Sequence, residues 1–331
     1  MDVTSLALPV VDVALQERLI SRLDEVERAL AEHVQSEAPF VTEAALHLMN
    51  AGGKRFRPLL VLLAAETGDP NGKGVIESAC VVELTHLASL YHDDVMDEAQ
   101  LRRGAETANA RWDNHVAILT GDFLFSKSSE LTAELGPDAV RIQGQTFTRL
   151  VEGQILETLG PGVDDDPLEH YLRVVAGKTG ALIATSAQYG ARFAGAPLEV
   201  EEALTEYGEK VGVAFQLSDD ILDIASESEE SGKTPGTDLR EGVPTLPVLI
   251  ALRSTDAADA RLLELLAGEL TDDALHAEAL TLLRAHPAMA EARAYVANLA
   301  AEAKDLLKVL GEGPVRTALE DFADVVADRS A

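Results

Sequence analysis

The amino-acid sequence predicts an all-α protein, and three of its features lead to that fold class. Aromatic residues make up only 4% of the chain and hydrophobic residues 47%, with many Ala and Leu, which favour helices. Apolar residues recur at helical spacing, as at Leu19, Leu23, Val26 and Leu30. No alternating pattern of useful length indicates a strand. We therefore expect helices of moderate length joined by short turns.

Turn-forming residues mark where these helices end. Gly and Pro interrupt the helical pattern at 51–53, 68–72, 136–137, 160–162 and 195–197, and a long polar stretch covers 226–244. No linker and no change in composition divides the chain. The chain is also long enough, at 331 residues, to enclose a cavity as well as a core. We therefore predict one domain over residues 1–331.

The charge of the chain limits its partners. A formal net charge of -30 disfavours binding to nucleic acid or to an anionic membrane surface, so an anionic substrate must meet a local group of cations. The single cysteine, Cys80, cannot form an internal disulfide and is typical of a small buried residue. No secretory signal is visible at the N-terminus, and the uncharged runs are too short to span a bilayer. These features favour a soluble, cytoplasmic protein without a transmembrane segment.

The strongest signal is a pattern of Asp, Asp, two other residues and Asp that occurs twice. The two copies are Asp93, Asp94 and Asp97, and Asp219, Asp220 and Asp223. In each copy the first and third aspartates are four residues apart within an apolar helical segment, so they share one face of a helix. A relaxed match at Asp165, Asp166 and Glu169 is interrupted by Pro167, and we interpret it as a solvated turn.

Carboxylates gathered on one helix face repel one another unless a cation lies between them. Mg²⁺ prefers oxygen ligands and commonly takes one or two carboxylates together with oxygens of a substrate phosphate. The two patterns therefore predict magnesium sites. The alternative is that they are acidic helix faces in water.

Cations cluster in the sequence around the same segments. They are Lys54, Arg55, Arg57, Arg102, Arg103, Lys178 and Lys233, several of them next to glycine. Such residues can approach a diphosphate closely, although any one of them could equally be a surface charge. His86 lies two helical turns before Asp93 and can face the same cavity, unless it is an ordinary core histidine.

Taken in order, these motifs resemble the polyprenyl synthetase family, the trans-isoprenyl diphosphate synthases, from about Gly52 to Pro247. The resemblance is carried by Gly-Gly-Lys54-Arg-Phe-Arg57-Pro, Glu83-Leu-Thr-His86, His92-Asp93-Asp94-Val-Met-Asp97, Arg102-Arg103-Gly104, Gly121-Asp122, Lys178-Thr179, Phe215-Gln216-Leu-Ser-Asp219-Asp220-Ile-Leu-Asp223 and Gly232-Lys233. It implies an all-α orthogonal helical bundle around a central cavity, usually a homodimer, with the two Asp motifs facing each other.

The resemblance also implies roles for individual residues. The six aspartates would hold Mg²⁺ on an allylic diphosphate, which Arg102, Lys178, Thr179, Gln216 and Lys233 would grip, while Lys54, Arg57, His86 and Arg103 would hold isopentenyl diphosphate. Ionisation of the allylic diphosphate, attack by the alkene and loss of a proton would lengthen the chain by one unit. Closure of the 226–244 loop would exclude water from the cation.

Two departures from the family pattern stand out. Glu241-Gly242-Val243 lacks a lysine that is frequent at its third position, and Gly153-Gln154-Ile-Leu-Glu157 has acid and amide exchanged relative to a common pattern. Neither removes a predicted metal or diphosphate residue.

Small residues precede the first Asp motif and indicate a long product. Ser89 and Thr85 lie one and two turns before Asp93 on its face, with Ala88 beside them, whereas members that make short products resemble this segment but carry aromatic rings there. Tyr91 is rotated away from that face. We therefore predict a medium- or long-chain polyprenyl product, hexaprenyl to decaprenyl, for a quinone side chain. The alternative is that Ala88 and Ser89 pack against a neighbouring helix.

Other functions remain open. The chain could be a geranylgeranyl or farnesyl diphosphate synthase, or a non-catalytic subunit of a heteromeric prenyl synthase, although such subunits tend to lose aspartates or the arginine pair. A terpene cyclase would have no need of Lys54, Arg57, His86 and Arg103.

Overall fold

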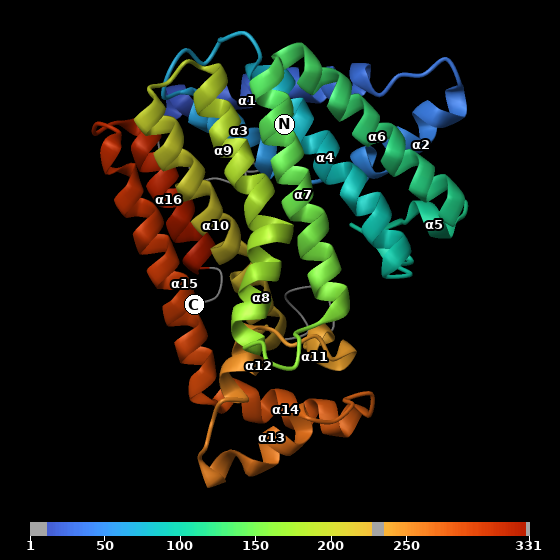
Figure 1. Cartoon of the computed structure of the whole chain (residues 1–331), viewed down its shortest axis with the longest axis vertical. Helices are drawn as coiled ribbons and strands as arrows, with labels where there is room; N and C mark the ends of the chain where they lie inside the picture. Colours follow the sequence, from blue (N-terminus) through green and yellow to red (C-terminus); the bar gives the residue numbers. More distant parts are fainter. Residues whose placement is uncertain (1–11, 227–234, 329–331) are drawn as a thin grey trace. The chain divides into compact units, whose positions relative to one another are not determined.

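The computed structural model describes residues 12–226 and 235–328, and it confirms the all-α prediction (Figure 1). The α-helices are α1 (Val13–His33), α2 (Pro39–Asn50), α3 (Phe56–Ala65), α4 (Val75–Met96), α5 (Ala108–Arg111), α6 (Asn114–Leu135), α7 (Pro137–Leu159), α8 (Pro167–Val175), α9 (Ala181–Phe193), α10 (Leu198–Ala225), α11 (Thr237–Glu241), α12 (Leu246–Ala251), α13 (Ala260–Leu266), α14 (Asp273–Ala285), α15 (Pro287–Leu306) and α16 (Pro314–Asp328). A π-helix, η2 (Ala176–Gly180), joins α8 to α9, and short 3₁₀ turns form η3 (Ala257–Asp259) and η4 (Leu307–Val309).

Among the described residues, the strands are limited to one small hairpin. Strand β1 (Leu101–Arg102) pairs antiparallel with β2 (Ala105–Glu106). The two turn residues, Arg103 and Gly104, have φ angles of 55° and 78°, which matches the twist of a tight two-residue hairpin. Strands of two residues are too short to leave an alternating pattern in the sequence.

The chain divides into two compact units. The first unit comprises Met1–Phe147, Leu182–Gly208 and Leu307–Leu319, and the second comprises Thr148–Ala181, Glu209–Leu306 and Glu320–Ala331. Helices α7 and α10 each contribute residues to both units. That the whole chain acts as one domain stays a prediction.

Helix α4 forms the centre of the first unit. Its residues Val81, Leu84 and Leu87 are fully buried, and its apolar side chains point in every direction, as expected for a helix surrounded by others. Helices α1, α3 and α6 pack against it. Helix α1 presents the predicted stripe, because its leucines and its valine at helical spacing are buried. The body of α4 is therefore held in the core, and its C-terminal end, which carries the first Asp motif, reaches the surface at Met96 and Asp97.

The second unit surrounds the end of α10 with shorter helices. Helix α8 runs into η2, α12 packs against both α8 and α15, and α13 packs against α14. In α12, Leu246, Val248 and Leu249 are buried. A π-helix widens the helical turn by one residue and is frequent at functional sites. Because Lys178 and Thr179 lie on η2, this feature supports their assignment as candidate site residues.

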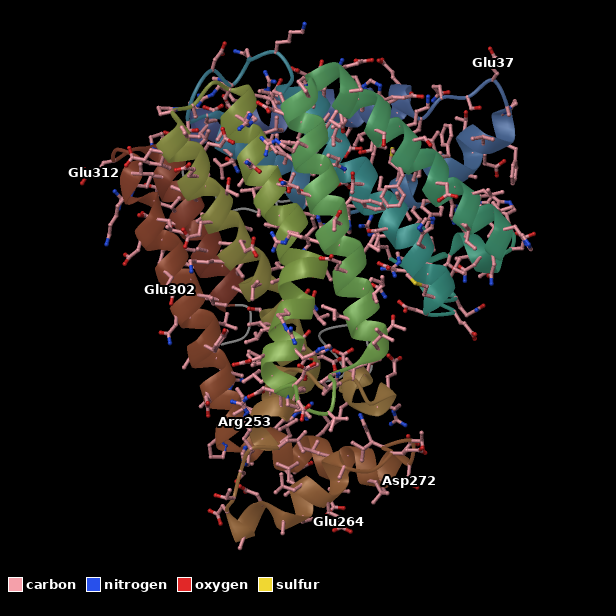
Figure 2. The ribbon with its side chains drawn as sticks, in the orientation of Figure 1. Glu37, Arg253, Glu264, Asp272, Glu302 and Glu312 are labelled. Atoms are coloured by element: carbon pink, nitrogen blue, oxygen red, sulfur yellow. The ribbon has the colours of Figure 1, made fainter. Side chains whose placement is uncertain are left out.

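The acidic excess of the chain lies in part at helix surfaces. The labelled side chains Glu264 of α13 and Glu302 of α15 are exposed, and Glu302 forms an ion pair with Lys210 at 2.8 Å (Figure 2). Glu312, in the loop before α16, is exposed as well. Helices long and apolar enough to cross a membrane are absent from the described ranges 12–226 and 235–328.

Candidate active site

The first Asp motif stands at the C-terminal end of α4. Asp93 is half-buried and Asp97, the residue that caps the helix, is exposed. Asp94 is fully buried, and its Oδ1 accepts a hydrogen bond from Arg102 Nε at 2.5 Å, while its Oδ2 has no partner. Burial raises the pKa of Asp94, and the Arg102 cation opposes that rise. A helix C-terminus already carries partial negative charge, so nearby cations are needed to stabilise three carboxylates at this position.

The second Asp motif stands near the C-terminal end of α10. Asp220 is 4% exposed and accepts hydrogen bonds from the Tyr171 hydroxyl and from Gln216 Nε2, the latter at 3.0 Å. Burial raises the pKa of Asp220 to about 7, although both hydrogen bonds favour the ionised form. The middle aspartate of each motif is thus buried and bonded to side chains of its own unit.

Asp223 has a different set of contacts. Its carboxylate accepts backbone N–H groups of Thr237 and Asp238, each at 3.2 Å, and its carbonyl accepts the N–H of Gly236 at 2.8 Å. These bonds satisfy donors at the start of α11. Asp223 therefore fixes the chain where the described residues resume after α10. Residues 227–234 of the predicted loop, which include Lys233, lie outside the described residues, whereas the remainder of the loop contains α11.

The Asp motifs do not form a preformed metal cluster. Nowhere in the described part of the chain do three Asp, Glu, His or Cys side chains gather closely enough to hold a metal ion. Mg²⁺ typically keeps several waters and takes only one or two carboxylates, with phosphate oxygens completing its shell. In the first unit, the unpartnered, buried Oδ2 of Asp94 and the half-buried Asp93 fit an ion that arrives with a phosphate. In the second unit, Asp219 is half-buried.

Lys178 and Thr179 lie on η2, beside the second Asp motif. Thr179 Oγ1 donates to Gln216 Oε1 at 3.2 Å, and Gln216 in turn donates to Asp220. Lys178 Nζ forms an ion pair with Glu157 Oε2 at 2.5 Å. Within the second unit, the predicted allylic residues Lys178, Thr179 and Gln216 are thus brought together.

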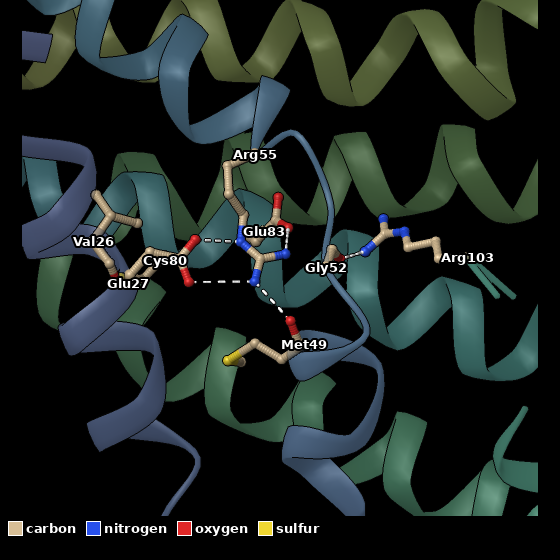
Figure 3. A network of polar contacts seen from close by, with 8 residues as sticks. All are labelled: Val26, Glu27, Met49, Gly52, Arg55, Cys80, Glu83 and Arg103. Carbon is tan, nitrogen blue, oxygen red and sulfur yellow. Dashed lines mark hydrogen bonds and ion pairs between the residues drawn. The ribbon is translucent and has the colours of Figure 1, made fainter. Parts of the chain in front are cut away.

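A second group of cations lies in the first unit, around the buried Glu83 of α4. Glu83 is 2% exposed, and Arg55 Nη1 donates to it at 3.2 Å (Figure 3). Arg55 also binds both carboxylate oxygens of Glu27 and the carbonyl of Met49. Burial raises the pKa of Glu83, whereas Arg55, Arg57 and Arg103 lower it. One buried carboxylate therefore faces three guanidinium groups.

The cations of this group act on one another. Burial and, to a smaller extent, the charge of Arg103 lower the pKa of Arg57 to about 10, although Glu83 opposes this change. The pKa of His86 is well below its usual value, first because of burial and then because of Arg57 and Arg103. His86 is therefore neutral at pH 7 in the protein without ligand. Nε of Arg57 is buried without a partner.

The Gly52-Gly53 turn lets Arg103 come close to this group. Arg103 Nη1 donates to the carbonyl of Gly52 (Figure 3), and a Cβ at Gly53 would lie 2.5 Å from the same nitrogen. Arg55 follows in a left-handed conformation, with φ 47°. Lys54, between them, is exposed. The predicted isopentenyl diphosphate residues Arg57, His86 and Arg103 thus form one group, with Lys54 at its edge.

The two adjacent arginines point to different partners. Arg102 Nε donates to Asp94, whereas Arg103 donates to Gly52. The small hairpin produces this divergence, because Arg102 is the last residue of β1 and Arg103 the first residue of its turn.

The predicted chain-length residues differ in their surroundings. Thr85 is buried, and its hydroxyl lies 2.8 Å from the carbonyl of Val81, 2.9 Å from Ser128 Oγ and 2.6 Å from Gln143 Nε2. Ala88 is fully buried and its carbonyl would lie 3.1 Å from a Cβ at Gly121, so this turn of α4 packs on α6. Ser89 is half-buried.

Tyr91 turns away from this face, as expected. Its hydroxyl donates to the carbonyl of Ala44 at 2.5 Å and accepts the N–H of Leu48 at 3.2 Å, so the ring is buried against α2.

Sequence reasoning missed Tyr171 and the pairing partners of the cations. Tyr171 lies seven residues before Lys178, the same spacing that drew attention to His86 before Asp93, so this signal could have found it. The ion pair of Glu157 with Lys178 could not be read from the sequence, because it depends on how α7 meets η2.

Comparisons with known proteins agree with this geometry. The sequence model described as polyprenyl synthetase matches residues 38–283. A nonaprenyl diphosphate synthase of Mycobacterium tuberculosis is 51% identical over 305 residues, which cover 92% of this chain and 91% of the relative. The crystal structure of a geranylgeranyl pyrophosphate synthase from Corynebacterium glutamicum, complexed with calcium and isoprenyl diphosphate, is 45% identical with a TM-score of 0.89, covering 98% of this chain and 99% of that chain.

A decaprenyl diphosphate synthase from Rhodobacter capsulatus is also similar, at 34% identity and a TM-score of 0.87 over 96% of this chain and 99% of that one. The fold and the site define a class of all-α proteins that carry an Asp motif near the C-terminal end of each of two long helices, here α4 and α10. The chain belongs to the polyprenyl synthetase family, and the resemblance inferred from its motifs is confirmed.

Proposed function

We propose that this chain is a magnesium-dependent trans-prenyltransferase that condenses isopentenyl diphosphate with an allylic diphosphate. The observation that carries the proposal is the excess of guanidinium charge around Glu83, together with the unpartnered Nε of Arg57. Arg55 is buried, Arg57 half-buried and Arg103 exposed, and these three cations have only Glu83 and Glu27 as carboxylate partners among the contacts described. The excess of positive charge favours an anion. A diphosphate carries several negative charges and can accept hydrogen bonds from Arg57, Arg103 and neutral His86.

We assign the metal ligands first to Asp93, Asp97 and Asp219. Asp93 and Asp97 lie one turn apart on α4 and are half-buried and exposed, respectively, and Asp219 is half-buried on α10. Asp94, Asp220 and Asp223 also hold Arg102, Tyr171 and the start of α11, so they orient the end of each helix as well as completing the predicted set of six metal ligands. The unpartnered Oδ2 of Asp94 supports that second role. Bound Mg²⁺ would neutralise the diphosphate charge that develops when the carbon–oxygen bond breaks.

The remaining steps fall to side chains of the chain itself. Lys178 and Thr179 would contact the allylic diphosphate, and Gln216 would hold Thr179 in position. Arg57, His86 and Arg103 would orient isopentenyl diphosphate so that its alkene attacks the allylic carbon. The proton lost afterwards would go to the released diphosphate. Because the product is again an allylic diphosphate, the cycle can repeat.

We propose a medium- or long-chain product, in the hexaprenyl to decaprenyl range, as the tail of a quinone. The small residues before Asp93 and the buried orientation of Tyr91 support it, as do the nonaprenyl and decaprenyl diphosphate synthases among the relatives. The similarity to a geranylgeranyl pyrophosphate synthase favours a shorter product as the alternative. A non-catalytic subunit is the other alternative, and activity of the chain alone would eliminate it.

We also propose a homodimer. Helix α7 exposes Val151, Ile155 and Leu159 at four-residue spacing, at 41%, 51% and 75%, and exposed apolar stripes of this kind favour protein contacts. The cytoplasmic location stays a prediction.

Incubation of the purified chain with labelled isopentenyl diphosphate and allylic primers of increasing length tests the function. We expect products that require Mg²⁺ and that disappear in excess chelator. Asp93→Asn and Asp219→Asn should each lower turnover by roughly two orders of magnitude with unchanged helical content, because an electrostatic contact to the leaving group is lost. Asp164→Asn, an equal charge change on an exposed turn, is the control. Full activity of either motif variant would refute the metal assignment.

A further inference from the structure

The second unit contains a close backbone contact between α7 and η2. A Cβ at Gly153 would lie 2.8 Å from the backbone nitrogen of Lys178, and one at Gly177 would lie 2.8 Å from the carbonyl of Arg149. Arg149 also pairs with Glu209 of α10, at 2.9 Å for one of its two bonds. The position of η2 against α7 is therefore fixed by backbone packing, and the side chain one turn beyond Gly153 comes within reach of Lys178.

That side chain is Glu157. Its Oε2 lies 2.5 Å from Lys178 Nζ, and the two side chains are 41% and 32% exposed. Water and a dissolved ligand can therefore reach the pair, and an ion pair of this exposure is weak enough for a multiply charged anion to displace it. In the protein without ligand, Lys178 is paired with Glu157.

Thr179, the residue after Lys178, connects η2 to the second Asp motif through hydrogen bonds. Thr179 bonds Gln216, and Gln216 bonds Asp220. The π-helix η2 thus carries Lys178 next to the residue that is linked through Gln216 to Asp220. The carboxylate that pairs with Lys178 comes from α7, whose placement does not depend on Lys178.

We propose that Glu157 is an internal competitor of the allylic diphosphate for Lys178. It holds the lysine side chain in one position in the free enzyme, must release it before the diphosphate binds, and takes it back when diphosphate leaves. Glu157 thereby weakens the grip on the allylic substrate and on released diphosphate. This inference rests on the proposed function, in which Lys178 binds the allylic diphosphate.

Calorimetric titration of the whole chain with Mg²⁺ and geranyl thiodiphosphate, an allylic analogue that ionises poorly, tests the proposal. Glu157→Gln keeps the shape and removes the charge, so it should bind the analogue and inorganic diphosphate about two- to fivefold more tightly than the native chain, the range for a partly exposed ion pair. In steady-state assays KM for the allylic primer should fall by the same factor, while KM for isopentenyl diphosphate stays constant. The difference in affinity between Glu157→Gln and the native chain should decrease at high salt.

Two controls separate this effect from net charge and from a structural role. Glu152→Gln removes the same charge from an exposed position about 140° around α7 and should leave the affinity unchanged. In a Lys178→Met background, Glu157→Gln should have no effect, because its only target is gone. Unchanged or weaker binding by Glu157→Gln would overturn the proposal. If the native chain itself binds no allylic analogue and makes no product, the proposed function fails instead.

Discussion

Glu83 is the residue on which the charges of the first unit converge. Arg55 pairs with it directly, and the charge of Glu83 opposes the burial that lowers the pKa of Arg57 and Arg103. Burial and the guanidinium groups around Glu83 lower the pKa of His86. Because His86 is kept neutral by burial and by neighbouring guanidinium groups, it can donate one hydrogen bond to an anion and can accept a proton once that anion is bound. The protonation state of His86 therefore depends on whether an anion is bound beside it.

Stability should depend on pH through His86. Its pKa is lowered in the folded chain relative to about 6.5 in the unfolded chain, so the unfolded chain takes up the proton first as pH falls. The stabilisation is present above about pH 6.5 and is lost below it. Between pH 7.5 and 5.5 the native chain should lose roughly 1 kcal/mol more unfolding free energy than His86→Gln, measured by urea denaturation.

Inorganic diphosphate provides the control for this prediction. A bound anion offsets the charges of Arg57 and Arg103, so the pH-dependent difference between the native chain and His86→Gln should shrink when diphosphate is present. A difference that is the same with and without diphosphate would show that no anion binds beside His86.

Arg102 and Arg103 should give different defects. Arg103→Ala should raise KM for isopentenyl diphosphate about tenfold or more, the value of a charged hydrogen bond, with little change in stability. Arg102→Ala should instead impair use of the allylic primer and also destabilise the chain by about 3 kcal/mol, because it leaves Asp94 buried without its partner. Steady-state kinetics and thermal unfolding measure both. Equal effects on the two substrates would contradict the assignment.

At the scale of elements, each Asp motif depends on where its helix ends. Helix α4 ends at Met96 and α10 at Ala225, so the carboxylates add to the negative end of two helix dipoles. Arg102 from the hairpin compensates the first end, and the hydrogen bonds of Tyr171 and Gln216 compensate the second. The helix ends are thereby ordered without metal and retain capacity for a cation.

The length of the product should depend on one face of α4. Ser89 is half-buried and its Oγ bonds only the carbonyl of His86 among the contacts described, whereas Ala88 packs on α6. Ser89→Phe should therefore shorten the product by several isoprene units without unfolding the chain, because a rigid ring would block the growing tail. Chromatography of the dephosphorylated products measures the change.

Ala88→Phe is the informative contrast. Its ring would have to displace the backbone packing at Gly121, so it should lower the melting temperature, unlike Ser89→Phe. Unchanged product length in a folded Ser89→Phe variant would show that another helix sets the length.

At the scale of the whole molecule, association must overcome a net charge of -30. Apolar stripes supply the attraction, and salt screens the repulsion between copies. Ile155→Glu on α7 should convert the proposed dimer into a monomer in sedimentation experiments. Val163→Glu makes the same charge change at a fully exposed loop position and should remain dimeric. A native chain that sediments as a monomer would contradict the homodimer.

The sequence alone determined the fold class, the family and most of the candidate site. Helical periodicity survives in any all-α chain, as the buried stripe of α1 illustrates, and the Asp pattern is local, so both can be read without coordinates. The hairpin at 101–106 escaped prediction because two-residue strands are held by their turn and by surrounding helices rather than by a pattern of their own.

Only the tertiary structure decided which charged residues meet. The sequence placed Glu83, Glu157 and Tyr171 on helices but could not pair them with Arg55, Lys178 and Asp220, because those partners lie 28, 21 and 49 positions away. Contacts at such separations depend on how helices cross, and here the crossings are set by features such as the glycine contact of α7 with η2 and the left-handed turn before α3. Local patterns fix what a helix carries on its faces, and packing fixes what each face meets.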